Sequence, residues 1–165
     1  MGTDGIEYMI QATEDLPVDV RFMLPSCVPA TPLDESGANL DYRAIDSFYD
    51  YPRVQGLAEM MNFVGAINAD PQVVEKIVAA QAHHKKIDGH APGLKGNDLN
   101  AYIAAGVYSD HECSELDDAI AKLQRGQFIM IREGTAARNL EALAPLLCDK
   151  YVERCMFCTD DKHPN

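Results

Sequence analysis

The sequence lacks the features that would direct it to a membrane or a nucleic acid. It has no apolar run approaching the roughly 20 residues of a membrane-spanning helix, and its N-terminus has no basic-then-apolar signal pattern. Basic residues are few, with 14 Lys and Arg against 26 Asp and Glu and a formal net charge of -12. Because such an acidic surface repels phosphate backbones and anionic lipids, we expect no nucleic-acid or membrane partner and a cytoplasmic location.

The cysteines do not form the pattern of a disulfide framework. The 165 residues include 5 cysteines, an odd and scattered set that argues against a secreted disulfide framework. Cys155 and Cys158 have the spacing of a redox or zinc pair, but they lie in an apolar stretch and no second pair completes a zinc knuckle. We therefore interpret both as small buried residues of a strand.

The chain does contain an alternation of short apolar runs with amphipathic stretches, in a composition typical of one globular domain. Brief runs rich in β-branched or aromatic residues predict buried parallel strands at Val18–Leu24, Gly56–Met60, Lys86–Gly89, Gly106–Ser109, Phe128–Ile131 and Arg154–Cys158. Amphipathic patterns predict helices at Pro71–Ala82, Asn97–Ala105, Glu115–Arg125 and Asn139–Leu147, with Asp70 and Ser114 as N-caps and Gly106 and Gly126 as stops. This alternation predicts an α/β fold.

Polar side chains follow the C-terminal ends of the predicted strands. They are Glu59, His90, His111, Glu133 and Asp160. In a (β/α) barrel those ends form the catalytic face, and each strand supplies one group. One such residue is more often an ordinary loop residue, but carboxylates and histidines in this order form a ligand set for a divalent metal. The pattern therefore predicts a metal site.

Several motifs together resemble bacterial adenine deaminases, a family of the amidohydrolase superfamily, over essentially the whole chain. They are Leu24-Pro-Ser-Cys-Val-Pro-Ala-Thr-Pro32, Gly56-Leu-Ala-Glu-Met-Met-Asn62, Asp88-Gly-His-Ala-Pro-Gly-Leu94, Leu99-Asn-Ala-Tyr-Ile-Ala-Ala-Gly106, Ser109-Asp-His-Glu112, Met130-Ile-Arg-Glu-Gly134 and Phe157-Cys-Thr-Asp-Asp-Lys-His-Pro164. The resemblance implies a metal-dependent barrel hydrolase that converts adenine and water to hypoxanthine and ammonia in purine salvage.

The resemblance also implies roles for individual residues. Glu59 would bridge two metal ions and serve catalysis, His90 and His111 would ligate metal, and Asp160 would ligate metal and move protons as general base and then acid. Manganese or ferrous iron is expected first and zinc is the alternative; any of them would lower the pKa of water from about 15.7 towards 7. Candidates for contacts to the purine base are Glu112, Arg132, Asp161 and His163.

Enzymes of this family supply a His-x-His pair from the first barrel strand, and this sequence contains none. The predicted strands match the third to eighth strands of the family. We therefore expect an incomplete (β/α)8 barrel of the TIM type over residues 1–165, without the first two strands. A binuclear site would form only if another polypeptide supplied the His-x-His pair, and we expect the chain alone to be inactive or nearly so.

Other interpretations are left open. The chain could be a catalytically inactive fragment or a metal-binding partner of a full-length homologue, or the intact enzyme could act on a related amidine or cyclic amide. The exposed edges of the first and last predicted strands could pair with another chain, including a second copy of this one. His83 and His84 are expected to form a solvated helix end, and Asp110 and Asp161 are either orienting partners of a ligand or plain loop residues.

Overall fold

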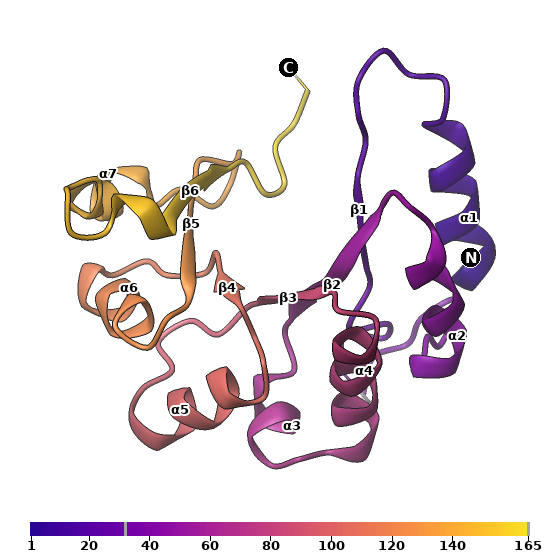
Figure 1. Ribbon diagram of the computed structural model, residues 1–165, viewed down its shortest axis with the longest axis horizontal. Coiled ribbons are helices and arrows are strands. Elements are labelled where there is room, and N and C mark those ends of the chain that lie inside the picture. Colours follow the sequence, from indigo (N-terminus) through magenta and orange to yellow (C-terminus); the bar gives the residue numbers. More distant parts are fainter. Residues whose placement is uncertain (32, 165) are drawn as a thin grey trace. The chain divides into compact units, whose positions relative to one another are not determined.

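The computed structural model describes residues 1–31 and 33–164, so that Pro32, the end of one motif, lies outside the described residues. The chain divides into two compact units, Met1–Asp88 and Gly89–Asn165. Each unit combines parallel strands with helices, which confirms the α/β class (Figure 1). A single barrel domain over residues 1–165 stays a prediction. Within the described part of the chain, no helix is long and apolar enough to cross a membrane.

The first sheet has the strand order β1-β2-β3 and places β1 at its edge. Its strands are β1 (Phe22–Leu24), β2 (Val54–Met60) and β3 (Lys86–Gly89). β1 and β2 are parallel, with Phe22 opposite Val54 and Leu24 opposite Leu57. β1 is shorter than the predicted run because its N-terminal part is exposed; Val18, for example, is 63% accessible. Pairing therefore begins only where the apolar side chains become covered.

Helix α4 (Pro71–Ala82) has the predicted bounds. The Asp70 carboxylate accepts a hydrogen bond from the backbone N–H of Gln72, and Pro71 occupies the first turn, where its missing N–H costs nothing. His83 ends this helix as predicted, but it is only partly exposed. Its ring packs against Tyr49 in a tilted arrangement with the centroids 5.1 Å apart, and its Nε2 lies 3.1 Å from Asp46 Oδ1. His84 is exposed as predicted.

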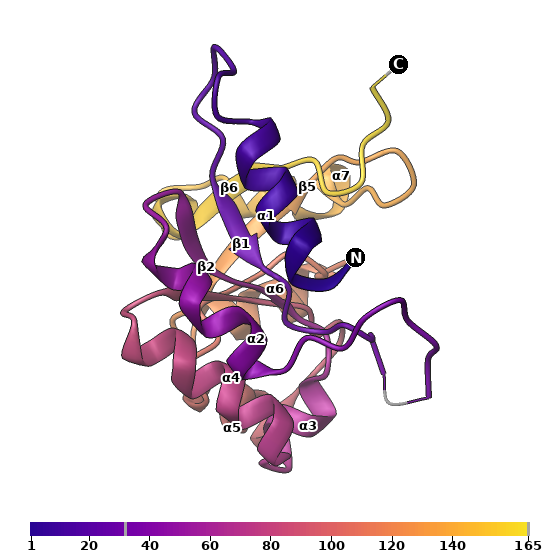
Figure 2. The same cartoon turned by 90° about the vertical axis from the view of Figure 1, so that its right-hand side faces the viewer.

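Three helices of the first unit carry no signal that was recognised in the sequence. They are α1 (Gly2–Ala12), α2 (Tyr42–Asp46), which continues into a 3-10 turn at Ser47–Asp50, and α3 (Phe63–Ile67). Helix α1 has no side-chain cap; instead, Arg53 donates hydrogen bonds to the carbonyls of Ile10 and Thr13. Figure 2 shows α1 alongside β1. Tertiary contacts therefore stabilise α1 where local signals are weak.

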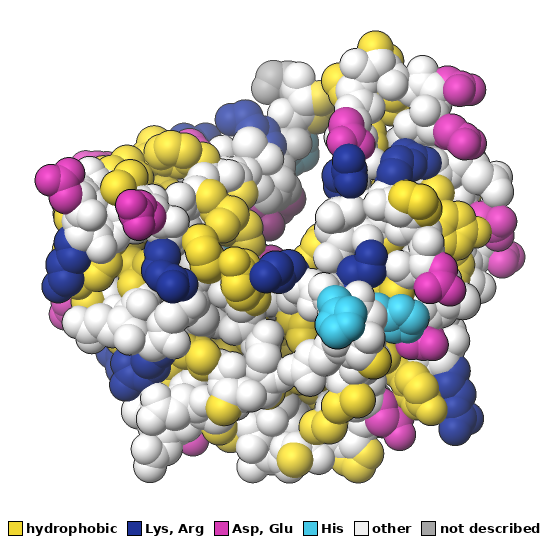
Figure 3. Space-filling view, viewed as in Figure 1, with side chains coloured by type: hydrophobic (Ala, Val, Ile, Leu, Met, Phe, Trp, Pro, Cys, Tyr) yellow, Lys and Arg dark blue, Asp and Glu magenta, His cyan; other side chains and the backbone are white. Residues whose placement is uncertain are grey.

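The second sheet has the order β4-β5-β6, with β5 in the centre and all pairs parallel. Its strands are β4 (Ser109–Asp110), β5 (Phe128–Arg132) and β6 (Cys155–Cys158). β4 begins later than predicted because Gly106, with φ 104°, reverses the chain after helix α5 (Gly96–Ala104). β6 is an edge strand whose Phe157 is 67% exposed. Hydrophobic side chains reach the surface among charged ones on the face shown in Figure 3.

Helix α6 (Leu116–Leu123) begins after Glu115 and has no side-chain cap, so the predicted N-cap at Ser114 is wrong. The last predicted helix is split into α7 (Leu140–Leu143) and a 3-10 turn at Ala144–Leu146. Pro145 lies in the first turn of the 3-10 segment; since proline lacks an N–H, it cannot continue the α-helical hydrogen bonding.

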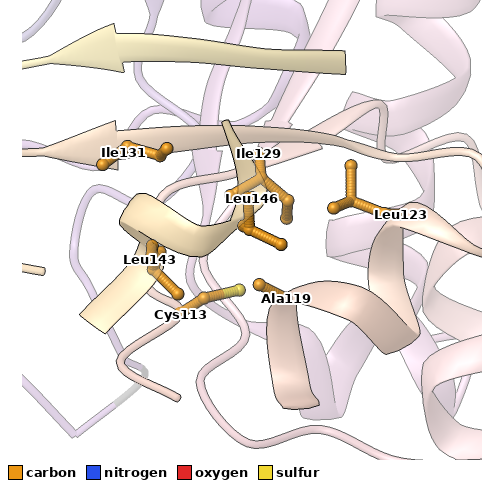
Figure 4. Close-up of a cluster of buried hydrophobic side chains, with 7 residues drawn as sticks. All are labelled: Cys113, Ala119, Leu123, Ile129, Ile131, Leu143 and Leu146. Atoms are coloured by element: carbon orange, nitrogen blue, oxygen red, sulfur yellow. The ribbon is translucent and has the colours of Figure 1, made fainter. Parts of the chain in front are cut away.

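The core of the second unit lies between β5, α6 and α7. Figure 4 shows its buried side chains, among which the Cys113 sulfur points toward Ala119; the full cluster is Cys113, Ala119, Leu123, Ile129, Ile131, Leu143 and Leu146. Cys155 packs against this cluster. Cys155 and Cys158 are strand residues as predicted, but both are only partly buried. Because positions three apart in a strand face opposite sides, the pair is not arranged to hold a zinc ion.

Candidate metal centre

The second unit brings together most of the predicted site residues. His90 follows the last residue of β3, His111 follows the last residue of β4, and Asp160 comes two residues after β6. Gly89 allows the chain before His90 to approach β4, because a Cβ at this position would lie only 2.4 Å from the carbonyl oxygen of Ser109. The side chains that follow these strand ends can therefore lie close together, as expected for the C-terminal ends of parallel strands.

His90 and His111 form a close pair. Their ring centroids are 5.6 Å apart at an interplanar angle of 77°. His111 is buried, and the backbone N–H of His90 donates to the hydroxyl of the buried Tyr102 at 3.0 Å. Two imidazoles that share one ion, each with its nitrogen about 2 Å from the metal, have ring centres roughly 5 to 6 Å apart. The pair therefore fits a divalent metal.

Glu112 faces both imidazoles. Its Oε1 lies 3.5 Å from His90 Nδ1 and 3.7 Å from His111 Nε2. Arg132, the last residue of β5, donates to both carboxylate oxygens, Nη2 to Oε2 at 2.9 Å and Nη1 to Oε1. The same Nη1 lies 3.2 Å from Asp160 Oδ2. Burial alone would lower the pKa of the Arg132 guanidinium, but the hydrogen bond with Glu112 and the charges of Glu112 and Asp160 outweigh it and raise the pKa.

The other predicted site residues of the second unit, Asp161, His163 and Glu133, contact the segment that follows β5. Asp161 and His163 are exposed, and both meet Thr135 through their backbones: the Asp161 carbonyl accepts from Thr135 N–H, and His163 N–H donates to Thr135 Oγ1. Their contact with a purine stays a prediction. Glu133 pairs with Arg138, with Arg138 Nε 3.8 Å from Glu133 Oε1. Glu133 therefore closes a local turn after β5.

Glu59 lies in the other unit, one residue before the end of β2, and is half-buried. Its carbonyl oxygen accepts a hydrogen bond from the hydroxyl of the buried Ser26. The Ser26 carbonyl in turn accepts from Lys76 Nζ at 2.7 Å, and burial lowers the pKa of that ammonium. These contacts fix the backbone of the Glu59 segment within the first unit. The role of Glu59 as a ligand stays a prediction.

Asp110 is not a plain loop residue. It is fully buried, and its carboxylate accepts from Ala91 N–H at 2.9 Å and from Glu112 N–H at 2.8 Å. Two residues bound in the same region, Asp118 and Lys122, are both buried and were not predicted from the sequence. Their i, i+4 spacing on a predicted helix was the available signal. That spacing is typical of a pair on the exposed surface of a helix and by itself does not indicate burial.

Comparison with known proteins gives a family and a set of relatives. A sequence model of the amidohydrolase family matches residues 1–163. The chain is 53% identical over 164 residues to a protein of Desulfatibacillum aliphaticivorans named adenine deaminase, which covers 99% of this chain and 29% of that protein. Proteins of the same name from Dehalococcoides mccartyi strain 195 and Methanosarcina mazei are each 50% identical, over 98% and 100% of this chain and 28% and 30% of theirs. The chain thus spans less than a third of these relatives.

Proposed function

The chain belongs to the amidohydrolase family, and from this premise we propose that it is part of an enzyme that hydrolyses adenine to hypoxanthine and ammonia. The observation that carries the proposal is identity of about half of all positions, along almost the whole chain, to relatives named adenine deaminase. We also propose that its strands correspond to the third to eighth strands of a (β/α)8 barrel and that the enzyme acts in the cytoplasm.

The proposed ligands of a divalent metal are Glu59, His90, His111 and Asp160. Imidazole and carboxylate donors suit manganese, ferrous iron or zinc, and we propose manganese or iron first. A bound divalent ion acidifies water and so supplies a nucleophile at neutral pH. The paired rings of His90 and His111 support the proposal. A binuclear site would need the His-x-His pair that this sequence lacks.

Asp160 is the proposed proton carrier. Its carboxylate takes a proton from the attacking water and gives it to the exocyclic nitrogen, so that the carbon–nitrogen bond breaks and ammonia leaves. Arg132 Nη1, 3.2 Å from Asp160 Oδ2, orients that carboxylate. Arg132 Nε is buried and has no hydrogen-bond partner among the described residues. Arg132 is therefore the best supported of the four proposed purine contacts; the other three are Glu112, Asp161 and His163.

A second candidate function is metal binding without turnover by this chain alone. It is favoured by the absence of a His-x-His pair among the 5 histidines of the sequence. A related amidine or cyclic amide as substrate is a further alternative, since the metal ligands do not select the purine ring. An assay of the chain alone with adenine and Mn²⁺ tests whether it binds metal without turnover. Ammonia release would show that the chain is active without a second polypeptide.

The proposed activity can be tested in a chimera in which this chain replaces the matching segment of the Desulfatibacillum relative. We expect the manganese-loaded chimera to release ammonia from adenine. His111→Ala should abolish this release, whereas His84→Ala, at an exposed position outside the centre, should leave it unchanged. A folded, manganese-loaded chimera that ignores adenine but deaminates another amidine would refute adenine as the substrate.

A further inference from the structure

We propose that Lys122 is a positioning residue that fixes His90 and His111 relative to each other, by joining the two loops that carry them. The inference rests on the proposed function, since it treats both histidines as ligands of one centre. Lys122 contacts neither imidazole among the described hydrogen bonds and ion pairs, so it acts through the backbone on either side of them.

Lys122 occupies an unusual place for a lysine. It lies in the last turn of α6 with none of its side chain exposed. Its Nζ donates to the carbonyl of Ala91 at 2.7 Å and lies 3.3 Å from both Asp110 Oδ1 and Asp118 Oδ2. The Cys113 sulfur is 3.4 Å away. A single buried cation is thus surrounded by four groups from three segments of the second unit.

The groups around Lys122 adjoin the two histidines directly. Ala91 is the residue after His90, and Asp110 is the residue before His111. Asp110 Oδ2 also accepts from Ala91 N–H at 2.9 Å, so the two loops are joined both by this hydrogen bond and by the shared ammonium. The backbone on one side of each imidazole is therefore held by the same cluster.

Asp118 extends the connection along the first loop. Its Oδ2 accepts from the backbone N–H of Gly93 at 3.1 Å, three residues after His90. On the second loop, Asp110 Oδ1 accepts from the N–H of Glu112, which is the residue that faces both imidazoles. Lys122 and its two carboxylates therefore hold the backbone after His90, and the backbone both before and after His111.

The charge of Lys122 is retained in this buried setting. Burial alone would lower the pKa of the ammonium, but Asp110, Cys113 and Asp118 outweigh it, and the pKa lies above its ordinary value. Burial raises the pKa of the Cys113 thiol, which therefore stays protonated. Removing the cation would leave two buried carboxylates without a counter-charge, and they would move or recruit water.

Stability alone is a weak explanation for this cluster. A buried ion pair often contributes no more than well-packed apolar residues of the same volume, because desolvating the charges offsets their attraction. The adjoining apolar core already joins α6 to β5 and α7 (Figure 4). The cluster contributes orientation, because its hydrogen bonds are made to the backbone beside His90 and His111. Groups that orient metal ligands in this way typically change metal affinity 10- to 100-fold when removed.

The test uses the whole chain with Lys122→Met, which keeps the side-chain length, and Asp118→Asn, which keeps the ammonium. Lys85→Met is the matched control, because Lys85 Nζ donates to the Val54 carbonyl at 2.7 Å in the other unit. Imidazole chemical shifts are measured by NMR without metal, and Mn²⁺ affinity is measured by calorimetry. We expect both cluster variants to shift the His90 and His111 signals but not those of His83 and His84. Mn²⁺ binding by Lys122→Met should weaken about 10- to 100-fold.

The outcomes separate this inference from the proposed function. Unchanged His90 and His111 signals in either folded variant, with Mn²⁺ affinity equal to that of Lys85→Met, would overturn the positioning role. If Lys122→Met does not fold, Asp118→Asn decides by the same two readouts. Failure of the unmodified chain to bind Mn²⁺ would count against the metal centre itself, whereas the metal-free imidazole signals would still decide whether Lys122 positions the pair.

Discussion

Arg132, at the end of β5, binds both carboxylate oxygens of Glu112, in the loop after β4. A two-pronged pair of this kind fixes orientation as well as distance, because the planar guanidinium matches the planar carboxylate. Glu112 is thereby held toward the imidazoles of His90 and His111. The pair connects the ends of two neighbouring parallel strands at the candidate centre.

Replacing Arg132 with methionine should destabilise the chain by about 2 kcal/mol, because Glu112, only 16% exposed, would lose its charged partner. Urea unfolding measures the change. Arg138→Met is the control: its pair with Glu133 is largely exposed and should contribute less than about 0.5 kcal/mol. Adding Glu112→Met to Arg132→Met should recover part of the loss. Equal destabilisation by the two arginine variants would contradict the prediction.

Tyr49 should make stability fall at high pH. Burial, reinforced by the charge of Asp46, raises the pKa of its hydroxyl above the ordinary value of 10.0. Above pH 10 the unfolded chain releases this proton while the folded chain retains it, so the free energy of unfolding decreases by at most about 1.4 kcal/mol per pH unit.

The Tyr49→Phe variant should lack that part of the decrease. Near neutral pH it should be as stable as the parent or more so, because Tyr49 Oη is buried without a hydrogen-bond partner among the described residues. Urea unfolding across the alkaline range makes the comparison, with Tyr8→Phe, at a 60% exposed position, as the control. Identical pH dependence in the parent and Tyr49→Phe would show that the Tyr49 proton is not linked to folding.

Leu143→Ala should cost about 2 to 5 kcal/mol of unfolding free energy, because it opens a cavity in the core of the second unit. Leu140→Ala changes the same residue type one turn earlier, at a 37% exposed position, and should cost less than about 1 kcal/mol. Thermal or urea unfolding measures both. A similar loss in the two variants would mean that α7 does not dock through Leu143.

We expect the chain to self-associate through the edge of β6, and Phe157→Lys should then reduce that association. Phe157 is 67% exposed on β6, an edge strand, and a charge placed there discourages pairing with a strand from another chain. Sedimentation velocity over a range of concentrations measures the effect. Val78→Lys, at a 53% exposed position on α4, adds the same charge away from a sheet edge and should leave association unchanged. Equal effects of the two variants would point to net charge as the cause.

The sequence by itself determined the class of the fold and the strand ends at which the candidate site residues lie. Asp70 and Pro71 set the start of α4, because a carboxylate cap and a proline act on the first turn only. Lys86–Gly89 was located without error; Ile87 and Gly89 are its buried positions, and Lys86 is exposed. His90 and His111 were identified because each follows the end of a predicted strand, a purely sequential relationship.

Only the tertiary structure decided which polar residues are buried and what they hold. In the sequence, Lys122 is an ordinary lysine of an amphipathic helix; it is buried because Asp110, from a distant strand end, supplies the counter-charge that makes burial tolerable. Helix α1 is likewise stabilised by Arg53, some forty positions away in the chain. Desolvation and pairing depend on neighbours brought together by folding, whereas caps, strands and strand-end residues depend on neighbours along the chain.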